Sequence, residues 1–353
     1  MPIASVNGQN LYYEDTGGRG PVLVFSHGLL MDHTMFAPQV QALQDRYRCI
    51  SWDERGHGQT ADPAHCAPFD YYDSADDLAA LLAHLGVERA VLVGMSQGGY
   101  LSLRCALIHP EVVRALVLID TQAMLEDPEQ MPHHEALLRA WMEHGLSDDM
   151  AATVERTILG QGWSGAAAWR AKWKKATPIN LGQSFLALAQ RDDISPRLPD
   201  IHVPALVIHG TDDIAITLDR ARAMAKALPR AQWVEVPGAG HAANLTHPQP
   251  VNLAIERFLE QLAIGQRASV VADAFPARPF AARVASIAPR VDARDLGDLL
   301  HRAVFGRGVV LGDHDHRRGQ GHALLRSDSS GLLFVAISIW SETVAQVAYM
   351  LDS

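Results

Sequence analysis

Residues 90–99, AVLVGMSQGG, decide the fold of this chain. The apolar run at 90–93 predicts a short strand, and a helical pattern begins directly behind Ser96. A serine between glycines on such a strand-to-helix turn is lifted above the sheet, where its hydroxyl can act as a nucleophile. The start of the helix leaves backbone N–H groups free for a developing oxyanion. The stretch therefore predicts a nucleophilic serine at position 96.

Similar apolar runs recur along the chain between helix-like segments. They lie at 22–25, 48–52, 115–119, 205–209 and 232–236. Nearly all-apolar strands that alternate with helices are typical of a parallel sheet covered on both faces. The pattern predicts an α/β fold with a doubly wound, mostly parallel sheet.

Two local signals refine this prediction. Asn7-Gly8 lies between short strand-like segments and indicates a hairpin near the N-terminus. The sequence Ser74-Ala75-Asp76-Asp77 resembles a capping box, so we expect a helix to begin there and to run through Leu85.

The alternation breaks between residues 119 and 201. Residues 122–199 read as helices and loops, and we interpret them as a helical cap inserted after the strand that ends near Ile119. Trp141 and Trp163 belong to this segment, and two interpretations stay open for them. They either fill the small core of the cap or line an apolar substrate pocket.

The predicted domains follow from this break. Residues 1–121 and 200–265 form the two parts of the α/β core, with 122–199 as the cap between them. Residues 266–353 form an extension of unknown structure. It is interpreted as a small appended domain, a partner-binding segment or a largely disordered tail, and a homo-oligomer is a separate expectation for the protein. Its cluster at 314–316, His-Asp-His, is read as a solvated loop in preference to a metal site.

Composition narrows the classes of protein. The formal net charge is -10 and no basic stripe is present, which argues against a nucleic-acid surface. Three cysteines without Cys-x-x-Cys spacing argue against a disulfide framework, and Cys49 and Cys105 lie in apolar runs that predict burial. No signal peptide and no stretch of transmembrane length is evident, so we expect a cytoplasmic protein that does not bind membranes.

A nucleophilic serine needs a base and an acid, each at the carboxyl end of a strand. Asp212 and Asp213 follow the run at 205–209, and His241 follows the run at 232–236. The order of serine, acid and histidine along the chain is that of doubly wound hydrolases. The residues alone leave both aspartates open as the acid.

Four ordered motifs now identify a family resemblance over roughly residues 3–262. They are FSHGL at 25–29, DERGHG at 53–58, GMSQGG at 94–99 and GHAAN at 240–244. The chain resembles the α/β-hydrolase family, and within it the branch of small-molecule esterases, enol-lactonases, haloperoxidase-like enzymes and carbon–carbon bond hydrolases. The extension from about residue 266 has no counterpart in that resemblance.

The resemblance implies roles for the triad. Ser96 is the expected nucleophile, His241 the general base and Asp213 the acid, with Asp212 as its rival. Asp120 is a third candidate, because some members of the family place the acid after the strand that ends near Ile119.

Further roles follow from the same resemblance. The backbone N–H groups of Leu29 and Gln97 are the expected oxyanion donors. His27 and Met95 join the two tryptophans as candidate pocket residues. His57 and Arg55 of the DERGHG motif are interpreted as structural.

The expected reaction is hydrolysis of a small carboxylic ester or lactone through an acyl-enzyme, without metal or cofactor. Carbon–carbon bond hydrolysis and perhydrolysis use the same triad and remain alternatives. A non-catalytic ligand-binding protein of this fold is a further one, although such proteins typically lose a triad member.

Overall fold

An eight-stranded sheet with the order β1-β2-β4-β3-β5-β6-β7-β8 lies in the first of two compact units, Met1–Ile255. Strands β3 to β8 pair in parallel, while β1 and β2 form an antiparallel hairpin joined to β4. The computed structural model describes residues 2–126 and 128–263, and the strands 267–270, 280–287, 320–323 and 335–340. The predicted mostly parallel sheet is confirmed. Its strands are β1 (Ile3–Val6), β2 (Gln9–Asp15), β3 (Val22–Ser26), β4 (Arg48–Trp52), β5 (Ala90–Met95), β6 (Val113–Ile119), β7 (Ala205–Gly210) and β8 (Ala231–Val236).

The predicted N-terminal hairpin is also confirmed. Val6 pairs with Gln9, and the two residues between them form the turn. Asn7 and Gly8 have φ angles of 48° and 73°, the positive values that a two-residue hairpin turn of this kind requires.

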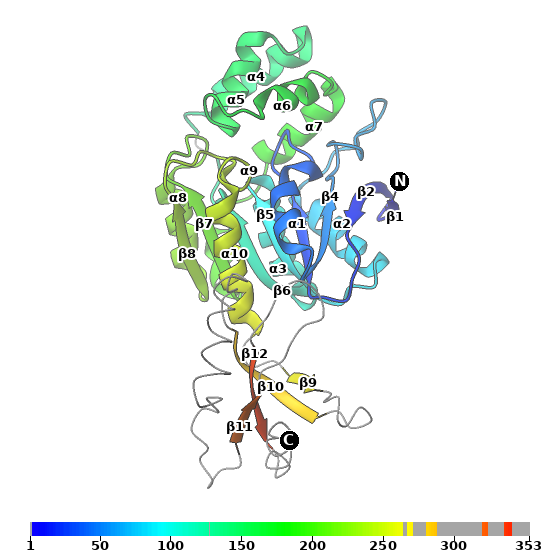
Figure 1. Cartoon of the computed structure of the whole chain (residues 1–353). Helices are drawn as coiled ribbons and strands as arrows, with labels where there is room; N and C mark the ends of the chain where they lie inside the picture. The colour runs from blue at the N-terminus through cyan, green and yellow to red at the C-terminus, as the bar shows by residue number, and fades with distance from the viewer. Residues whose placement is uncertain are drawn as a thin grey trace. The chain divides into compact units, whose positions relative to one another are not determined.

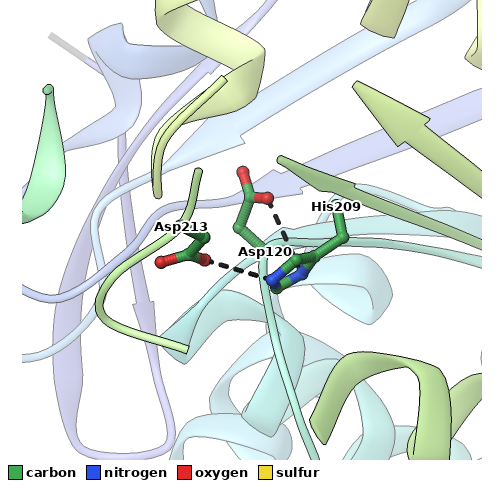
Figure 2. A group of neighbouring side chains, drawn as sticks. All are labelled: Asp120, His209 and Asp213. Carbon is green, nitrogen blue, oxygen red and sulfur yellow. Dashed lines mark ion pairs between the residues drawn. The ribbon is translucent and has the colours of Figure 1, made fainter. Parts of the chain in front are cut away.

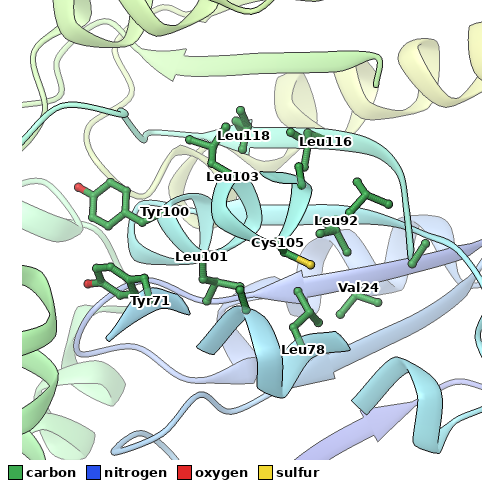
Figure 3. Close-up of a cluster of buried hydrophobic side chains, with 14 of the residues drawn as sticks. Val24, Tyr71, Leu78, Leu92, Tyr100, Leu101, Leu103, Cys105, Leu116 and Leu118 are labelled. Carbon is green, nitrogen blue, oxygen red and sulfur yellow. The ribbon is translucent and has the colours of Figure 1, made fainter. Parts of the chain in front are cut away.

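One face of the sheet is covered by α2 (Tyr71–His84), α3 (Gln97–Ile108) and α8 (Leu218–Ala227). Figure 3 shows Leu78 and Leu101 of the first two helices packed over Val24 and Leu92 of the sheet. These side chains are fully buried, and their removal from water supplies the main stabilisation of this layer.

The opposite face carries α1 (Ala37–Leu43) and α10 (Pro248–Ala263). Phe25 alternates with Val24 along β3, so its ring points to this face, where it contacts Phe36 at 5.1 Å between ring centroids. Phe36 ends the 3₁₀ helix η1 (His33–Phe36) that leads into α1. The Gln39 amide of α1 donates to Asn252 of α10 at 2.8 Å. The sheet is therefore covered on both faces, as its apolar strands predict (Figure 1).

The N-cap of helix α2 lies four residues before the predicted one at Ser74, so that prediction was wrong in register. Its N-cap is Asp70, and Asp70 and Asp73 form the reciprocal capping box. Ser74 lies within the helix, where its hydroxyl donates to the Asp70 carbonyl at 3.2 Å. Asp77 is fully buried and pairs with an arginine, so its carboxylate is not free to cap. Asp can serve as N-cap as well as Ser, and the same spacing recurs at 70–73.

Between β6 and β7 the described regular elements are all helical, as expected for the cap. They are α4 (Met131–His144), α5 (Asp148–Ile158), α6 (Ala166–Trp173), α7 (Pro178–Ala189) and the 3₁₀ helix η3 (Ser195–Asp200). Figure 1 shows α4 to α7 gathered at one end of the sheet. Two contacts join this cap to the loop after β3: Trp173 Nε1 donates to the Leu30 carbonyl at 2.9 Å, and Lys172 pairs with Asp32 at 2.7 Å.

The second unit, Glu256–Ser353, contains four described strands in the order β11-β12-β10-β9. All three pairings are antiparallel. The strands are β9 (Arg267–Val270), β10 (Phe280–Ile287), β11 (Gln320–Ala323) and β12 (Val335–Trp340). The His-Asp-His cluster at 314–316 lies outside the described residues.

Two shorter helices complete the first unit, η2 (Pro110–Val112) and α9 (Ala243–Thr246). Cys49 and Cys105 are buried free thiols, as predicted, and burial raises the pKa of each to about 12. Within the described part of the chain, no helix has both the length and the hydropathy needed to cross a membrane.

Candidate active site

Ser96 lies at the junction of β5 and α3 in a conformation that serine rarely adopts, with φ 50° and ψ -113°. Such a residue costs about 1–3 kcal/mol, so its surroundings must fix it. The Ser96 N–H donates to the Ile119 carbonyl at 2.9 Å, and the Thr121 hydroxyl donates to the Ser96 carbonyl at 2.7 Å. The neighbouring strand therefore holds the serine at the turn.

The glycines of the motif are required by space. A Cβ on Gly98 would lie 1.9 Å from the Ser26 carbonyl oxygen, and one on Gly94 would lie 2.2 Å from the Gly98 carbonyl oxygen. Both distances are well inside van der Waals contact with backbone. Only glycine lets α3 start this close to β3 and β5.

Three side chains from three loops form one hydrogen-bonded path. Ser96 Oγ is 2.9 Å from His241 Nε2, and His241 Nδ1 is 2.8 Å from Asp213 Oδ2. The second Asp213 oxygen accepts the backbone N–H groups of Ala215 at 2.8 Å and Ile216 at 3.0 Å. The predicted serine, histidine and Asp213 are thus brought together, and Asp213, in preference to the exposed Asp212, bonds the histidine.

The charges around His241 suit a general base. Burial alone would lower the pKa of His241, but the charge of Asp213 and the hydrogen bond to it raise this pKa above its usual value. Burial in turn would raise the pKa of Asp213, yet His241 and the N–H of Ile216 hold it below its usual value. The pair therefore favours an ionised aspartate that stabilises an imidazolium. The arrangement can move a proton from the Ser96 hydroxyl to His241.

Asp120, the third candidate acid, bonds to backbone N–H groups of the two loops that carry Asp213 and His241. Its two oxygens accept the backbone N–H groups of Gly210 at 2.8 Å and Ala243 at 2.9 Å. Gly210 precedes the loop of Asp213, and Ala243 follows His241. Burial and the charge of Asp213 raise the pKa of Asp120 well above its usual value. Asp120 therefore ties together the two loops that carry the acid and the base.

Figure 2 shows the side chains of Asp120, His209 and Asp213 gathered in one cluster, and all three are buried. His209 Nε2 donates to the Ile216 carbonyl at 2.9 Å and lies 3.3 Å from Asp213 Oδ2. Burial lowers the pKa of His209, which favours the neutral ring. These three side chains offer ligand atoms within 4.8 Å of one another. N–H groups occupy the carboxylate oxygens of Asp120 and Asp213, whereas the buried His209 Nδ1 has no hydrogen-bond partner among the described residues.

Sequence reasoning missed His209. The signal was its position as the penultimate residue of β7, directly before the loop of the acid.

The His-Gly loop supports the other side of Ser96. His27 is 1% exposed, and its Nδ1 lies 2.9 Å from the Gly28 carbonyl. Its Nε2 accepts the N–H of Glu54 at 3.0 Å. Leu29 follows in this loop and lines the same cavity as Ser96, while Gln97 is the first residue of α3. The expected oxyanion donors thus lie on the two segments that flank the serine.

Two other polar residues of the DERGHG motif make structural contacts. Arg55 pairs with Asp77 of α2, its Nε 2.5 Å from Asp77 Oδ2. His57 Nδ1 lies 2.8 Å from the Arg55 carbonyl, and burial lowers the pKa of His57 to about 3. These contacts agree with the structural interpretation of both residues.

A cavity of about 470 Å³ contains Ser96 and His241 in its lining. Met95 and Trp141 line it, as expected, together with apolar side chains of the cap such as Phe185. Sequence reasoning missed its polar residues; Tyr100, Gln122, Glu126 and Arg220 are among them.

His27 and Trp163, two of the expected pocket residues, lie outside the lining found among the described residues. Both ring nitrogens of His27 are engaged beneath the loop. The indole of Trp163 lies against the chain at Gly165, where a Cβ would be 2.3 Å from the ring.

Comparison with known proteins agrees with this geometry. A family model described as alpha/beta hydrolase fold matches residues 21–248. The chain belongs to the α/β-hydrolase family. This α/β hydrolase is 31% identical over 254 residues to a 2-(acetamidomethylene)succinate hydrolase of Mesorhizobium japonicum, covering 69% of this chain and 89% of that relative. It is 32% identical over 246 residues to a pimeloyl-(acyl-carrier protein) methyl ester esterase of Nitrosomonas europaea, covering 67% and 94%.

A solved structure gives the same result. The enol-lactonase from Burkholderia xenovorans LB400 matches with a TM-score of 0.67 and 29% identity, over 73% of this chain and 99% of that one. The α/β-hydrolase fold of the chain and its membership of the hydrolases are therefore shown.

Proposed function

We propose that this α/β hydrolase cleaves a small carboxylic ester or lactone through an acyl-enzyme on Ser96. The observation that carries the proposal is the unbroken hydrogen-bond path from Ser96 through His241 to Asp213, at a cavity that contains the first two in its lining. A buried serine on a strained turn, joined to a histidine and an ionised aspartate, is the arrangement that acyl transfer needs.

The reaction follows from the atoms present. Ser96 Oγ attacks the carbonyl carbon while its proton passes to His241 Nε2. The backbone N–H groups of Leu29 and Gln97 stabilise the oxyanion, a contribution of about 3–4 kcal/mol per donor. His241 then gives its proton to the leaving oxygen, and the acyl group remains on Ser96. A water molecule, deprotonated by the same histidine, releases the acid and restores the serine.

The cavity supports a small substrate. Its volume of about 470 Å³ falls within the range of pockets that hold small molecules. Apolar side chains of the cap, Trp141 and Phe185 among them, suit an aliphatic or cyclic acyl group. The relatives named esterase and enol-lactonase support the same class of substrate.

The test is Ser96→Ala with p-nitrophenyl butyrate as substrate. We expect this variant to lose hydrolysis and to escape labelling by a fluorophosphonate probe while its melting temperature stays near the wild-type value. Ser5→Ala changes an exposed serine on β1 and serves as the matched control. Full activity of Ser96→Ala, or no adduct on Ser96 in the wild type, refutes the proposal.

Because the same triad serves carbon–carbon bond hydrolysis and perhydrolysis, the substrate panel includes enol-lactones, ring-cleavage diketones and peroxide. Faster turnover of a diketone than of any ester, still dependent on Ser96, would keep the nucleophile and change the reaction. An intact wild-type fold without adduct or turnover would favour the ligand-binding alternative.

A further inference from the structure

Glu54 is a buried acid that the proposed mechanism does not use. It follows β4 in the DERGHG motif, and its side chain is 1% exposed. Its backbone and its side chain contact different segments, and these two segments carry the two proposed oxyanion donors.

The backbone of Glu54 supports the His-Gly loop. Its N–H donates to His27 Nε2 at 3.0 Å, so Nδ1 of that ring carries the proton and donates to the Gly28 carbonyl at 2.9 Å. Leu29, the first proposed donor, is the next residue. The backbone of Glu54 therefore helps to position the Leu29 donor through its hydrogen bond with His27.

The side chain of Glu54 supports the start of α3. The Gln97 amide donates to Glu54 Oε2, and the Tyr71 hydroxyl donates to the Gln97 Oε1 at 3.3 Å. Both ends of the Gln97 amide are thus held. The backbone N–H of the same residue is the second proposed donor.

The surroundings of Glu54 favour the uncharged acid. Its Oε1 has no hydrogen-bond partner among the described residues. Burial and the charge of Asp77 raise the pKa of Glu54 to about 8, while the hydroxyl of Ser74, the amide of Gln97 and the cation of Arg55 offset this in part. Because Arg55 is itself paired with Asp77, its positive charge stabilises the ionised form of Glu54 only in part.

Polar and charged groups face Glu54 from three neighbouring elements and from its own loop. They are Tyr71, Ser74 and Asp77 of α2, Gln97 of α3, His27 of the loop after β3, and Arg55 beside it.

We propose that Glu54 is a positioning residue that, as a neutral carboxylic acid, holds both oxyanion donors in place for the reaction. This inference rests on the proposed function. When Glu54 ionises, a negative charge appears on the acceptor of the Gln97 side-chain amide, and Gln97 is the residue whose backbone N–H is the second proposed oxyanion donor. Transition-state stabilisation then falls, so activity declines as the pH rises through about 8.

The experiment is the pH dependence of kcat and KM for p-nitrophenyl butyrate, corrected for uncatalysed hydrolysis. Relative to Glu54→Gln, in which His241 titrates in the same way, the wild type should lose about tenfold in kcat between pH 7 and pH 9, because a group with this pKa is about nine-tenths ionised at the upper value. Glu54→Gln keeps a neutral hydrogen-bonding side chain. It should retain kcat within about threefold at pH 7 and lose the alkaline decline.

Two variants separate positioning from structure. Glu54→Ala should lower kcat at pH 7 by about tenfold or more with little change in KM, because oxyanion contacts strengthen only in the transition state. Tyr71→Phe removes one hydrogen bond to Gln97 and should lower kcat less while keeping the alkaline decline. Glu88→Gln, an exposed acid on the surface, is the matched control and should follow the wild type throughout.

Thermal melting provides a second readout with a definite sign. The pKa of folded Glu54 lies above its unfolded value, so the folded state binds more protons between about pH 5 and pH 8. Wild-type stability should therefore fall relative to Glu54→Gln as the pH rises through this window.

The inference is overturned if Glu54→Gln keeps the wild-type alkaline decline, or if Glu54→Ala keeps full kcat. It is also overturned if Glu54→Gln lowers the melting temperature equally at all pH values without changing the kinetic profile. Fluorophosphonate labelling of Ser96 in the same samples tests the proposed function separately.

Discussion

Replacing Asp213 by asparagine tests the triad at the atom where its geometry is most restrictive. Asp213 Oδ1 accepts two backbone N–H groups, from Ala215 and Ile216. An asparagine amide nitrogen cannot sit there, because it would meet two fixed donors. It must take the place of Oδ2, which faces His241 Nδ1 at 2.8 Å.

The consequence is a change of tautomer. To accept from the new amide, His241 must leave Nδ1 unprotonated and carry its proton on Nε2, which faces Ser96 Oγ at 2.9 Å. The histidine then donates to the serine and cannot accept its proton. A triad with the wrong tautomer loses about 10⁴-fold in kcat, which corresponds to ~5 kcal/mol of activation free energy.

The assay is steady-state hydrolysis of p-nitrophenyl butyrate at pH 7.5 with active-site titration. We expect Asp213→Asn to lose about 10⁴-fold in kcat with KM nearly unchanged. Asp212→Asn is the matched control: its neighbouring, exposed side chain accepts from the Thr211 hydroxyl, and it should stay within about twofold of the wild type. A loss below tenfold for Asp213→Asn, or an equal loss for the control, would refute the assignment.

Three further predictions follow from the site and its supports. Because the pKa of His241 is raised, kcat/KM should fall as the pH drops through a value above the usual ~6.5, and a lower midpoint in the pH profile would contradict this. Asp77→Ala leaves the largely buried Arg55 cation unpaired, so urea unfolding should show that the free energy of unfolding falls by about 3–5 kcal/mol. A smaller fall in the double variant with Arg55→Met would confirm that the unpaired charge is the cause, and an equal or larger fall would contradict it. Trp141→Ala enlarges the cavity and should raise the ratio of octanoyl to butyryl ester hydrolysis by roughly fivefold or more, whereas Trp163→Ala, outside the lining, should leave that ratio unchanged.

The sequence predicted those parts of the site in which a single local pattern determines both place and role. The elbow at Ser96 is one, because only a strand, a tight turn and a helix accommodate its glycines. The loops of Asp213 and His241 are others, because parallel strands end at one edge of a sheet and bring their loops together. The residue pattern alone could not choose Asp213 over Asp212, because the conformation of the loop decides which of two neighbouring side chains points toward His241.

The misassignments share another cause, which is competition between equally good local partners. The capping box at 74–77 matched its pattern, but the Asp77 carboxylate is engaged by Arg55, and the cap forms at Asp70. Similarly, His27 belongs to the oxyanion loop in sequence, yet both of its nitrogens bond to backbone. Contacts between residues far apart in the chain decide such cases.

The pocket was the least predictable part for a related reason. Its walls come from loops of the core and from α4, α5 and α7 of the cap, so their mutual positions depend on tertiary packing. Trp141 and Trp163 look alike in the sequence, but only the first lies in the described lining. The support that Glu54 gives to Gln97 joins residues of two separate motifs, and no spacing along the chain could reveal it.

The insertion of the cap between β6 and β7 gives the enzyme two parts that can evolve at different rates. Ser96, Asp213, His241 and both proposed oxyanion donors come from the core, so mutations in the cap can alter which substrate is accepted without dismantling the reaction. Such change requires that an altered cap still contacts the loop after β3. There the Trp173 indole donates a hydrogen bond to the carbonyl of Leu30, the residue next to a proposed oxyanion donor. Homologues that keep this contact can change their substrate specificity while the catalytic residues of the core stay the same.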